Sequence, residues 1–258
     1  MEKTLKTLLK DGFILVFNQD GLDVVETAKA MMDAGFGQME LTCRVSRPLE
    51  KLKRLKKELP EFACGLASLI DNPAALDALN AARPHDPTPS VRQAVDAGAD
   101  YLVSAINFRP ETYAEFAGKI PIVPGCATAT EIVTQHALGA NLCKLFPASV
   151  IGGPAYIKAI DPAIHRSVSI VPTGGTNQGN IPEYIDAGVI VLGGSFSMFG
   201  EKTAREIIDK QNYALLAEKM AEIKQLIKQQ RGKKWPNLDF EKASIQEIAE
   251  TTGKILNA

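Results

Sequence analysis

The sequence carries no excess of charge of either sign, few aromatic residues and no long apolar run. Its 258 residues include 29 Lys and Arg against 30 Asp and Glu, a formal net charge of −1. This balance argues against a protein whose main partner is nucleic acid or an anionic membrane surface. No apolar run approaches the roughly 18 residues that a membrane-spanning helix needs. We therefore expect neither a nucleic-acid partner nor a membrane partner.

Cysteine is also scarce. The four cysteines show no paired spacing, so the sequence predicts neither a zinc site nor a disulfide framework. The first eleven residues are rich in charge and leave no room for the apolar segment of a secretory signal. We expect reduced thiols and a cytoplasmic location. The remaining composition, 45% hydrophobic and 23% charged, is that of an ordinary globular protein and argues against disordered or collagen-like structure.

Short apolar runs of strand length alternate with longer amphipathic stretches along most of the chain. The runs predict strands at residues 12–17, 39–42, 63–68, 101–104, 122–123, 142–146, 169–171 and 189–192. Helical patterns between them include residues 22–34, 49–59, 131–138 and 181–187. A glycine follows four predicted helices, at Gly35, Gly98, Gly139 and Gly188, where we expect the left-handed conformation that ends a helix.

Eight strands alternating with helices predict a parallel sheet, and about 230 residues is the usual size of a (β/α)8 barrel. A doubly wound open sheet would place Gly-x-Gly-x-x-Gly after the first strand, where the chain has Asn-Gln-Asp-Gly at residues 18–21. Glycine pairs follow the seventh and eighth strands instead. We therefore expect an α/β fold of the (β/α)8 TIM-barrel type over residues 1–230, with a short C-terminal helical extension over residues 231–258.

Two further segments have distinct patterns. Residues 81–90 contain three prolines and predict a loop inserted between the third and fourth strands. A +4, +3, +4 apolar stripe predicts the core face of the last barrel helix. The stripe consists of Leu216, Met220, Ile223 and Ile227.

Barrel active sites lie at the carboxyl ends of the strands, which draws attention to Lys144 in the sixth strand. Strand alternation places Lys144 and Phe146 on one face and Cys143 on the other. Desolvation of an ammonium group favours the neutral amine, which can attack a carbonyl and form a Schiff base. The pattern alone also allows a strand-end lysine whose amine reaches water.

The second strand places Glu40, Thr42 and Arg44 on a common face. Enclosed charged groups need partners, so a structural Glu40–Arg44 pair near the barrel mouth is one interpretation. In the other interpretation, Glu40 transfers protons and Arg44 binds a substrate carboxylate through two parallel hydrogen bonds. The residue pattern leaves both open.

Glycine pairs follow the seventh strand at residues 174–175 and the eighth at residues 193–194. Glycine lets backbone N–H groups approach an anion, and these two loops are the usual phosphate site of the barrel fold. Either pair alone is typical of a tight turn. Together, in these two loops, they predict a phosphate site.

These residues resemble the bacterial 2-keto-3-deoxy-6-phosphogluconate (KDPG) and 4-hydroxy-2-oxoglutarate (KHG) aldolase family. The signature segments occur in family order at residues 40–44, 123–125, 144–148, 172–175 and 193–195, each at the end of an expected strand. The resemblance implies a class I aldolase on a (β/α)8 barrel that forms a homotrimer and needs no metal and no cofactor. Its partner would be a small-molecule 2-keto acid, in phosphorylated form.

The resemblance also implies roles for single residues. Lys144 matches the Schiff-base lysine and Glu40 the proton-transferring carboxylate. Arg44 matches the arginine that holds the pyruvate carboxylate, with Thr173 nearby, and Ser68 keeps a hydroxyl at the end of the third strand. The phosphate-binding loops are matched by Gly174, Gly175, Gly194 and Ser195.

Three segments depart from the family pattern. The third strand ends Gly-Leu-Ala-Ser at residues 65–68 where the family has Gly-x-Gly-Thr, and the fourth ends Ser-Ala-Ile-Asn at residues 104–107 in place of Ser-Pro-Gly. After the lysine, the family's Pro-Ala-Glu is Pro-Ala-Ser at residues 147–149. All three lie around the aldehyde end of the expected site, so substrate choice can differ while the core chemistry is kept.

The sequence thus predicts a lyase that reversibly cleaves a KDPG-like 2-keto-3-deoxy sugar acid phosphate. The products would be pyruvate and an aldehyde such as glyceraldehyde 3-phosphate, in carbohydrate metabolism of the Entner–Doudoroff type. One alternative is a phosphosugar isomerase or epimerase in which Glu40 is the base. Another is a non-catalytic barrel that binds a phosphorylated metabolite, which the altered third and fourth loops would suit.

Overall fold

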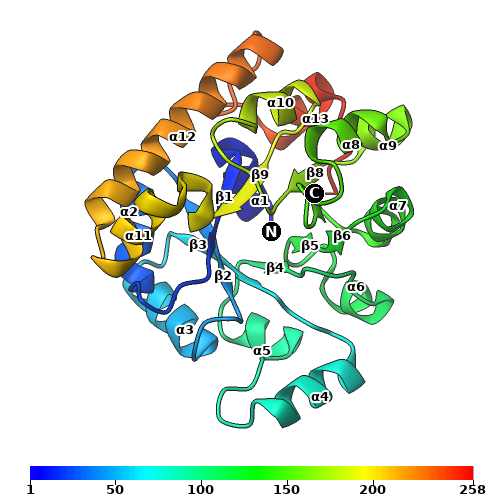
Figure 1. The fold of residues 1–258 in the computed structure, drawn as a ribbon. Coiled ribbons are helices and arrows are strands. Elements are labelled where there is room, and N and C mark those ends of the chain that lie inside the picture. Colours follow the sequence, from blue (N-terminus) through cyan, green and yellow to red (C-terminus); the bar gives the residue numbers. More distant parts are fainter. Residues whose placement is uncertain (258) are drawn as a thin grey trace.

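The computed structural model describes residues 1–257 as an α/β fold in which strands curve around a common centre and helices lie outside them (Figure 1). Every strand pairing is parallel. A six-stranded sheet has the order β5-β4-β3-β2-β1-β9, and a three-stranded sheet has the order β6-β7-β8. The strands are β1 (Phe13–Phe17), β2 (Gln38–Thr42), β3 (Ala63–Ala67), β4 (Tyr101–Val103), β5 (Ile122–Val123), β6 (Gly125–Cys126), β7 (Cys143–Leu145), β8 (Ile170–Pro172) and β9 (Leu192–Ser195). The expectation of an α/β fold with a parallel sheet is confirmed.

The two sheets meet at Pro124, which lies between β5 and β6. Proline has no backbone N–H, so it interrupts the ladder of hydrogen bonds there. Backbone groups in β7 and just before it nevertheless form hydrogen bonds to β5 and to Pro124 itself. The N–H of Asn141 donates to Ile122 O at 3.1 Å, and the N–H of Lys144 donates to Pro124 O at 2.8 Å. These bonds hold β7, and therefore Lys144, against the edge of the larger sheet.

Helices follow most strands and cover the outside of the sheets (Figure 1). The four glycines predicted to end helices have φ between 84° and 114°, in the left-handed region, as expected. The helices are α1 (Glu2–Asp11), α2 (Val24–Asp33), α3 (Pro48–Glu58), α4 (Pro73–Ala82), α5 (Val91–Asp96), α6 (Pro110–Phe116), α7 (Ala129–Leu138), α8 (Gly153–Ala159), α9 (Pro162–Ser167), α10 (Ile181–Asp186), the 3-10 helix η1 (Phe196–Phe199), α11 (Glu201–Asp209), α12 (Tyr213–Lys234) and α13 (Ile245–Thr252).

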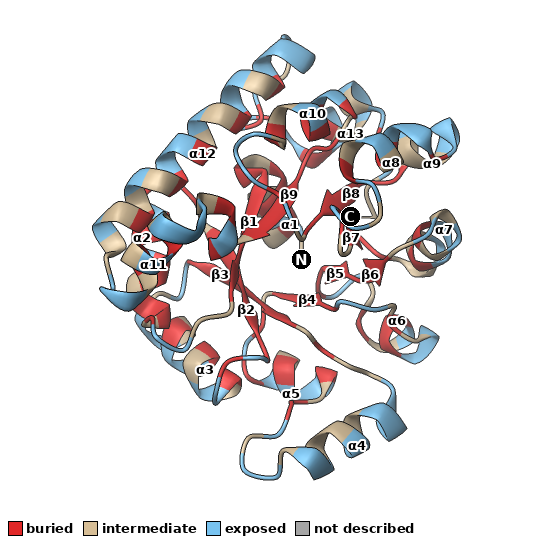
Figure 2. Ribbon diagram, in the orientation of Figure 1, coloured by how far each residue is buried: buried red, intermediate tan, exposed pale blue. Residues whose placement is uncertain are grey.

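The core fills the space inside the strands and between strands and helices (Figure 2). The apolar stripe of α12 is buried and α12 packs against α2 and α10, so its prediction as a core face is confirmed. Among residues 1–257 no helix is both long enough and apolar enough to cross a bilayer.

Two sequence predictions are wrong in their bounds. The expected strand at residues 189–192 lies three residues later, because β9 pairs from Leu192 to Ser195 with Phe13 to Val16 of β1. The glycines taken for a turn are part of this strand. The expected loop at residues 81–90 begins only at Arg83, because the alanine-rich α4, with Asn72 as its N-cap, continues to Ala82.

The segment after α12 packs across the amino ends of the strands. Ile255 forms a parallel bridge with Val168, just before β8, and the side chain of Asn257 donates to Ala140 O, just before β7, at 2.8 Å. The guanidinium of Arg231 donates to Leu9 O and Lys10 O in the last turn of α1 and to Ile190 O before β9. The last turns of α12 and the segment after it thus lie at the amino ends of β7, β8 and β9.

Candidate active site

A cavity of about 210 Å³ opens at the carboxyl ends of the strands, the end where barrel enzymes carry their active sites. Residues from both sheets and from the loops that follow their strands line it. They are Val16, Asn18, Glu40, Arg44, Ser68, Ala105, Lys144, Phe146, Thr173, Gly174, Gly175, Thr176, Ser195 and Ser197. Eight of the nine site residues expected from the sequence are in this set.

Lys144 lies in the middle of β7, which is itself the central strand of the smaller sheet. Its side chain reaches into the cavity beside Phe146, with Nζ 5.6 Å from the ring centroid, while Cys143 packs away from it against α7. The predicted alternation along this strand is therefore confirmed. Lys144 is only 6% exposed, so the interpretation in which its amine reaches water is wrong.

Glu40 lies in β2, a central strand of the larger sheet, between Val16 of β1 and Gly65 of β3. Its carboxylate accepts a hydrogen bond from Lys144 Nζ at 2.8 Å, and it is 2% exposed. The structural Glu40–Arg44 pair considered from the sequence is not formed. The partner of Glu40 is a lysine 104 residues away in the chain.

The aromatic side chain of Tyr101 packs against β3 beside Glu40. A Cβ at Gly65 would lie 2.2 Å from the ring of Tyr101, so the absence of a side chain there lets the ring lie against β3. The hydroxyl of Tyr101 donates to Gln38 Oε1 at 2.9 Å. Tyr101 and Gln38 are fully buried, and both members of the ion pair line the cavity.

The arrangement of Lys144 and Glu40 suits proton transfer. Burying two charges is costly, and their mutual attraction offsets that cost only when the geometry is good. At 2.8 Å a proton can be exchanged directly between the amine and the carboxylate. A neutral amine in an enclosed cavity is the nucleophile that Schiff-base chemistry requires.

Arg44 lies just beyond the end of β2, where its exposed side chain lines the cavity. Within residues 1–257 it forms no ion pair, so its guanidinium is available to an anionic ligand. Ser68 lines the cavity from the end of β3 and has φ 62°, a left-handed conformation that is uncommon for serine. A strained polar residue at a cavity wall is typical of a binding site.

The loops after β8 and β9 form another wall of the cavity. Gly174 and Gly175 have φ 90° and 85°, and a Cβ at Gly175 would lie 2.2 Å from Ser149 Oγ, so this turn requires glycine. Thr173 and Ser195 line the cavity beside it. Gly194 does not line the cavity: its Cα faces Phe13 and Met198 on the other side of β9.

Sequence reasoning missed several residues that line the cavity, chiefly Asn18 and Ser197. Asn18 follows β1 and Ser197 follows β9, so the rule that active-site residues lie at strand ends could have found both. The sequence Asn-Gln-Asp-Gly was considered only as a failed phosphate turn. Within the described residues 1–257, no three His, Cys, Asp or Glu side chains are grouped to hold a metal ion.

A lysine buried within hydrogen-bonding distance of a carboxylate, where a ketone can enter from the cavity, is the arrangement of a class I aldolase, a lyase that works through a Schiff base. A family model described as KDPG and KHG aldolase matches residues 8–218, and the chain belongs to that family. The resemblance drawn from the sequence is confirmed, as is the prediction of an aldehyde-lyase that acts on a KDPG-like substrate.

Individual relatives agree with this family. The chain is 30% identical over 184 residues to the 2-dehydro-3-deoxy-phosphogluconate aldolase of Treponema pallidum, covering 70% of this chain and 79% of the relative. It is 27% identical over 193 residues to the enzyme of the same name from Pseudomonas aeruginosa, covering 74% and 78%. Its fold is similar to the KDPG aldolase of Legionella pneumophila, with a TM-score of 0.67, 24% identity and coverage of 86% and 98%. That structure holds pyruvate as a covalent carbinolamine intermediate.

Proposed function

We propose that Lys144 is the Schiff-base nucleophile of a reversible aldolase that splits a KDPG-like 2-keto-3-deoxy acid into pyruvate and an aldehyde. The observation that carries this proposal is the 2.8 Å hydrogen bond between Lys144 Nζ and Glu40 Oε1 inside the cavity. An isomerase or epimerase would use Glu40 as its base without needing a buried lysine beside it. The hydrogen bond therefore favours covalent catalysis.

The proposed reaction begins when the neutral amine of Lys144 attacks the C2 ketone. Glu40 relays a proton to the departing hydroxyl, water leaves, and a protonated imine remains. The imine accepts the electron pair as the C3–C4 bond breaks, and Glu40 takes the proton of the C4 hydroxyl. The aldehyde leaves first. Protonation at C3 and hydrolysis of the imine then release pyruvate and restore Lys144.

Substrate binding follows from the two walls of the cavity. Arg44 binds the carboxylate next to the reacting ketone, with the hydroxyls of Ser68 and Thr173 beside it. The loop that contains Gly174 and Gly175, together with Ser195 at the end of β9, binds the phosphate at the far end, chiefly through backbone N–H groups; Gly194, which does not line the cavity, is not part of this site. The left-handed φ values of Gly174 and Gly175 support this assignment, because they leave the backbone open to an anion. Holding both ends aligns the C3–C4 bond with the imine.

Borohydride reduction in the presence of pyruvate tests the nucleophile. We expect a stable pyruvyl adduct on Lys144, located by peptide mass mapping, and none in Lys144→Ala. The exposed Lys158 of α8 provides the matched control, and Lys158→Ala should be labelled as fully as the unaltered protein. An adduct at another lysine would contradict the assignment of Lys144. No adduct at all would favour the isomerase or a protein that only binds its ligand.

The phosphate site has a separate test. In the condensation direction, we expect Ser195→Ala to raise the KM for glyceraldehyde 3-phosphate and to leave the KM for pyruvate unchanged. Equal effects on both would show that Ser195 does not act at the phosphate end.

The proposal extends to the whole molecule. Residues 1–230 form one closed (β/α)8 barrel, and residues 231–258 form an extension. The bonds from β7 to Ile122 and Pro124 support closure on one side. On the other side, a Cβ at Gly193 of β9 would lie 2.4 Å from Thr173 Oγ1, next to β8, which shows how near these two strands are. A cytoplasmic homotrimer in Entner–Doudoroff-type metabolism is the assembly and setting we propose. Sedimentation velocity would test the trimer.

A further inference from the structure

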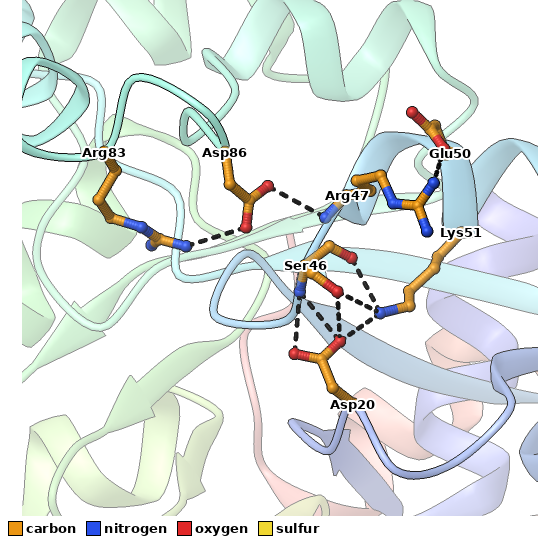
Figure 3. A network of polar contacts seen from close by, with 7 residues as sticks. All are labelled: Asp20, Ser46, Arg47, Glu50, Lys51, Arg83 and Asp86. Carbon is orange, nitrogen blue, oxygen red and sulfur yellow. Dashed lines mark hydrogen bonds and ion pairs between the residues drawn. The ribbon is translucent and has the colours of Figure 1, made fainter.

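The segment between α4 and α5 contacts the turn between β2 and α3 (Figure 3). Asp86 makes the contact. Its Oδ1 accepts a hydrogen bond from the backbone N–H of Arg47 at 3.0 Å, and its Oδ2 accepts one from Arg83 Nη2 at 3.2 Å. The ion pair with Arg83 is local, so it holds the Asp86 carboxylate in place for the longer-range bond to Arg47.

The backbone of Arg47 has a strained conformation that such a bond can stabilise. Arg47 caps the amino end of α3 with φ 48° and ψ 55°, a left-handed conformation that costs free energy for any residue with a Cβ. Its side chain does not cap the helix. A strained conformation persists only when surrounding contacts enforce it, and the bond from Asp86 is such a contact.

The same turn is held from its other side by the loop after β1. The Asp20 carboxylate accepts hydrogen bonds from the N–H of Ser46 at 3.0 Å and from its hydroxyl at 2.7 Å, and it pairs with Lys51 (Figure 3). Lys51 also donates to Ser46 O at 2.9 Å. Residues 46 and 47 are thus fixed between Asp20 and Asp86.

Arg44 lies two residues before this fixed point and has no ion pair of its own within residues 1–257. Its position in the cavity therefore depends on the backbone that carries it.

We propose that Asp86, held by Arg83, is a positioning residue that orients Arg44 toward the substrate carboxylate. This inference rests on the proposed function, in which Arg44 binds that carboxylate. The 83–90 segment then has a role in ground-state binding of the keto acid. It acts through the backbone of the β2–α3 turn, and its side chains do not touch the substrate.

The test measures borohydride trapping at Lys144 as a function of pyruvate concentration. We expect Asp86→Ala to raise the half-saturating pyruvate concentration by about 3- to 10-fold, as one lost positioning hydrogen bond would, and to leave the trapping rate at saturating pyruvate unchanged. Asp86→Asn should restore most of the affinity, because an amide oxygen still accepts the Arg47 N–H bond. Asp77→Ala on the exposed side of α4 is the matched control and should behave as the unaltered protein.

A double substitution separates positioning from a general loss of stability. If Asp86 acts through Arg44, Asp86→Ala adds nothing to the defect of Arg44→Gln. Additive effects, or an unchanged half-saturating concentration in Asp86→Ala while Arg44→Gln is impaired, would overturn the positioning role and leave the aldolase proposal intact. Absence of any adduct in the unaltered protein would instead overturn the aldolase proposal. Should Asp86→Ala fail to fold, Arg83→Met serves in its place: a smaller rise of the same sign supports the role, and no change contradicts it.

Discussion

Lys144 and Glu40 are each buried next to the other's charge, so each depends on a polar partner at that position. Removing one member of a buried pair leaves an uncompensated charge, which costs more than the pair contributed. The Lys144–Glu40 hydrogen bond is therefore expected to contribute both to the stability of the fold and to the proposed reaction. It also explains how an ionisable lysine can be placed on the central strand of a sheet.

Glu40→Gln tests the proton-transfer role at the residue scale. The amide keeps the volume but cannot accept and return a proton, so we expect kcat for cleavage to fall roughly 10²- to 10⁴-fold. Borohydride trapping should still label Lys144, only more slowly. Glu26→Gln, on the surface of α2, is the control and should leave kcat unchanged. Full turnover in Glu40→Gln would assign proton transfer to another group.

The four thiols give a second prediction for single residues. All four cysteines are free and buried, and burial raises the pKa of Cys43 to about 12 and that of Cys64 further above its ordinary value. The thiolate is the reactive form, so these thiols should be inert in the folded protein. We expect no alkylation by iodoacetamide at pH 7.5, measured by intact mass, and four additions after denaturation. Rapid labelling of any cysteine before unfolding would contradict the burial described for it.

At the scale of elements, the C-terminal segment is fixed by a buried lysine. Lys254 donates to His165 O at the end of α9 and to Val168 O at 3.4 Å. Burial lowers its pKa from 10.5 to about 8. Between pH 8 and 10.5 the unfolded chain therefore holds a proton that the folded protein has released.

This difference fixes the sign of a pH effect. Stability rises with pH wherever the unfolded state binds more protons, so Lys254 should add stability as pH rises from 8 toward 10.5, by about 3 kcal/mol at most. Lys254→Met should lack this contribution. Urea unfolding of both proteins at pH 7.5, 8.5 and 9.5 measures it as the difference in slope. Parallel curves would show that Lys254 keeps its proton in the folded state.

The limits of sequence-based prediction are clearest at this same scale. Glycine after Leu138 or Ala187 predicted the helix ends, because only the left-handed conformation satisfies the last carbonyls there. The bounds of β9 could not be found this way. Its glycines were interpreted as a turn, whereas their missing side chains make room for Thr173 and Phe13 across the strand. Local sequence patterns indicate the backbone conformation of single residues. They do not indicate which distant segment packs against those residues in the folded protein.

For the whole molecule, the segment after α12 is expected to stabilise the amino ends of the strands. It buries Trp235, Phe240, Ile245 and Ile248. We expect truncation after Lys234 to lower the melting temperature by on the order of 10 °C, because several buried side chains are lost together. Calorimetry measures the shift, and pyruvate trapping should still label Lys144 at low temperature.

Two results bear on this prediction. Ile248→Ala, which removes one buried side chain of the segment, should lie between the truncated and the full chain. An unchanged melting temperature after truncation would show that the segment packs without contributing to stability. Sedimentation of the truncated chain would also show whether the segment takes part in the proposed trimer.

The sequence by itself determined the alternation of strands and helices, the glycines that end helices and the side chains that share one face of β7. Each of these depends on the chemistry of short segments, in which side-chain alternation and backbone freedom are local properties. Only the tertiary structure decided that Glu40 pairs with Lys144 and leaves Arg44 unpaired. It also decided that the 83–90 segment returns to fix the turn beside Arg44. Partners so distant in the chain are selected by the packing of the whole sheet, which no local pattern encodes.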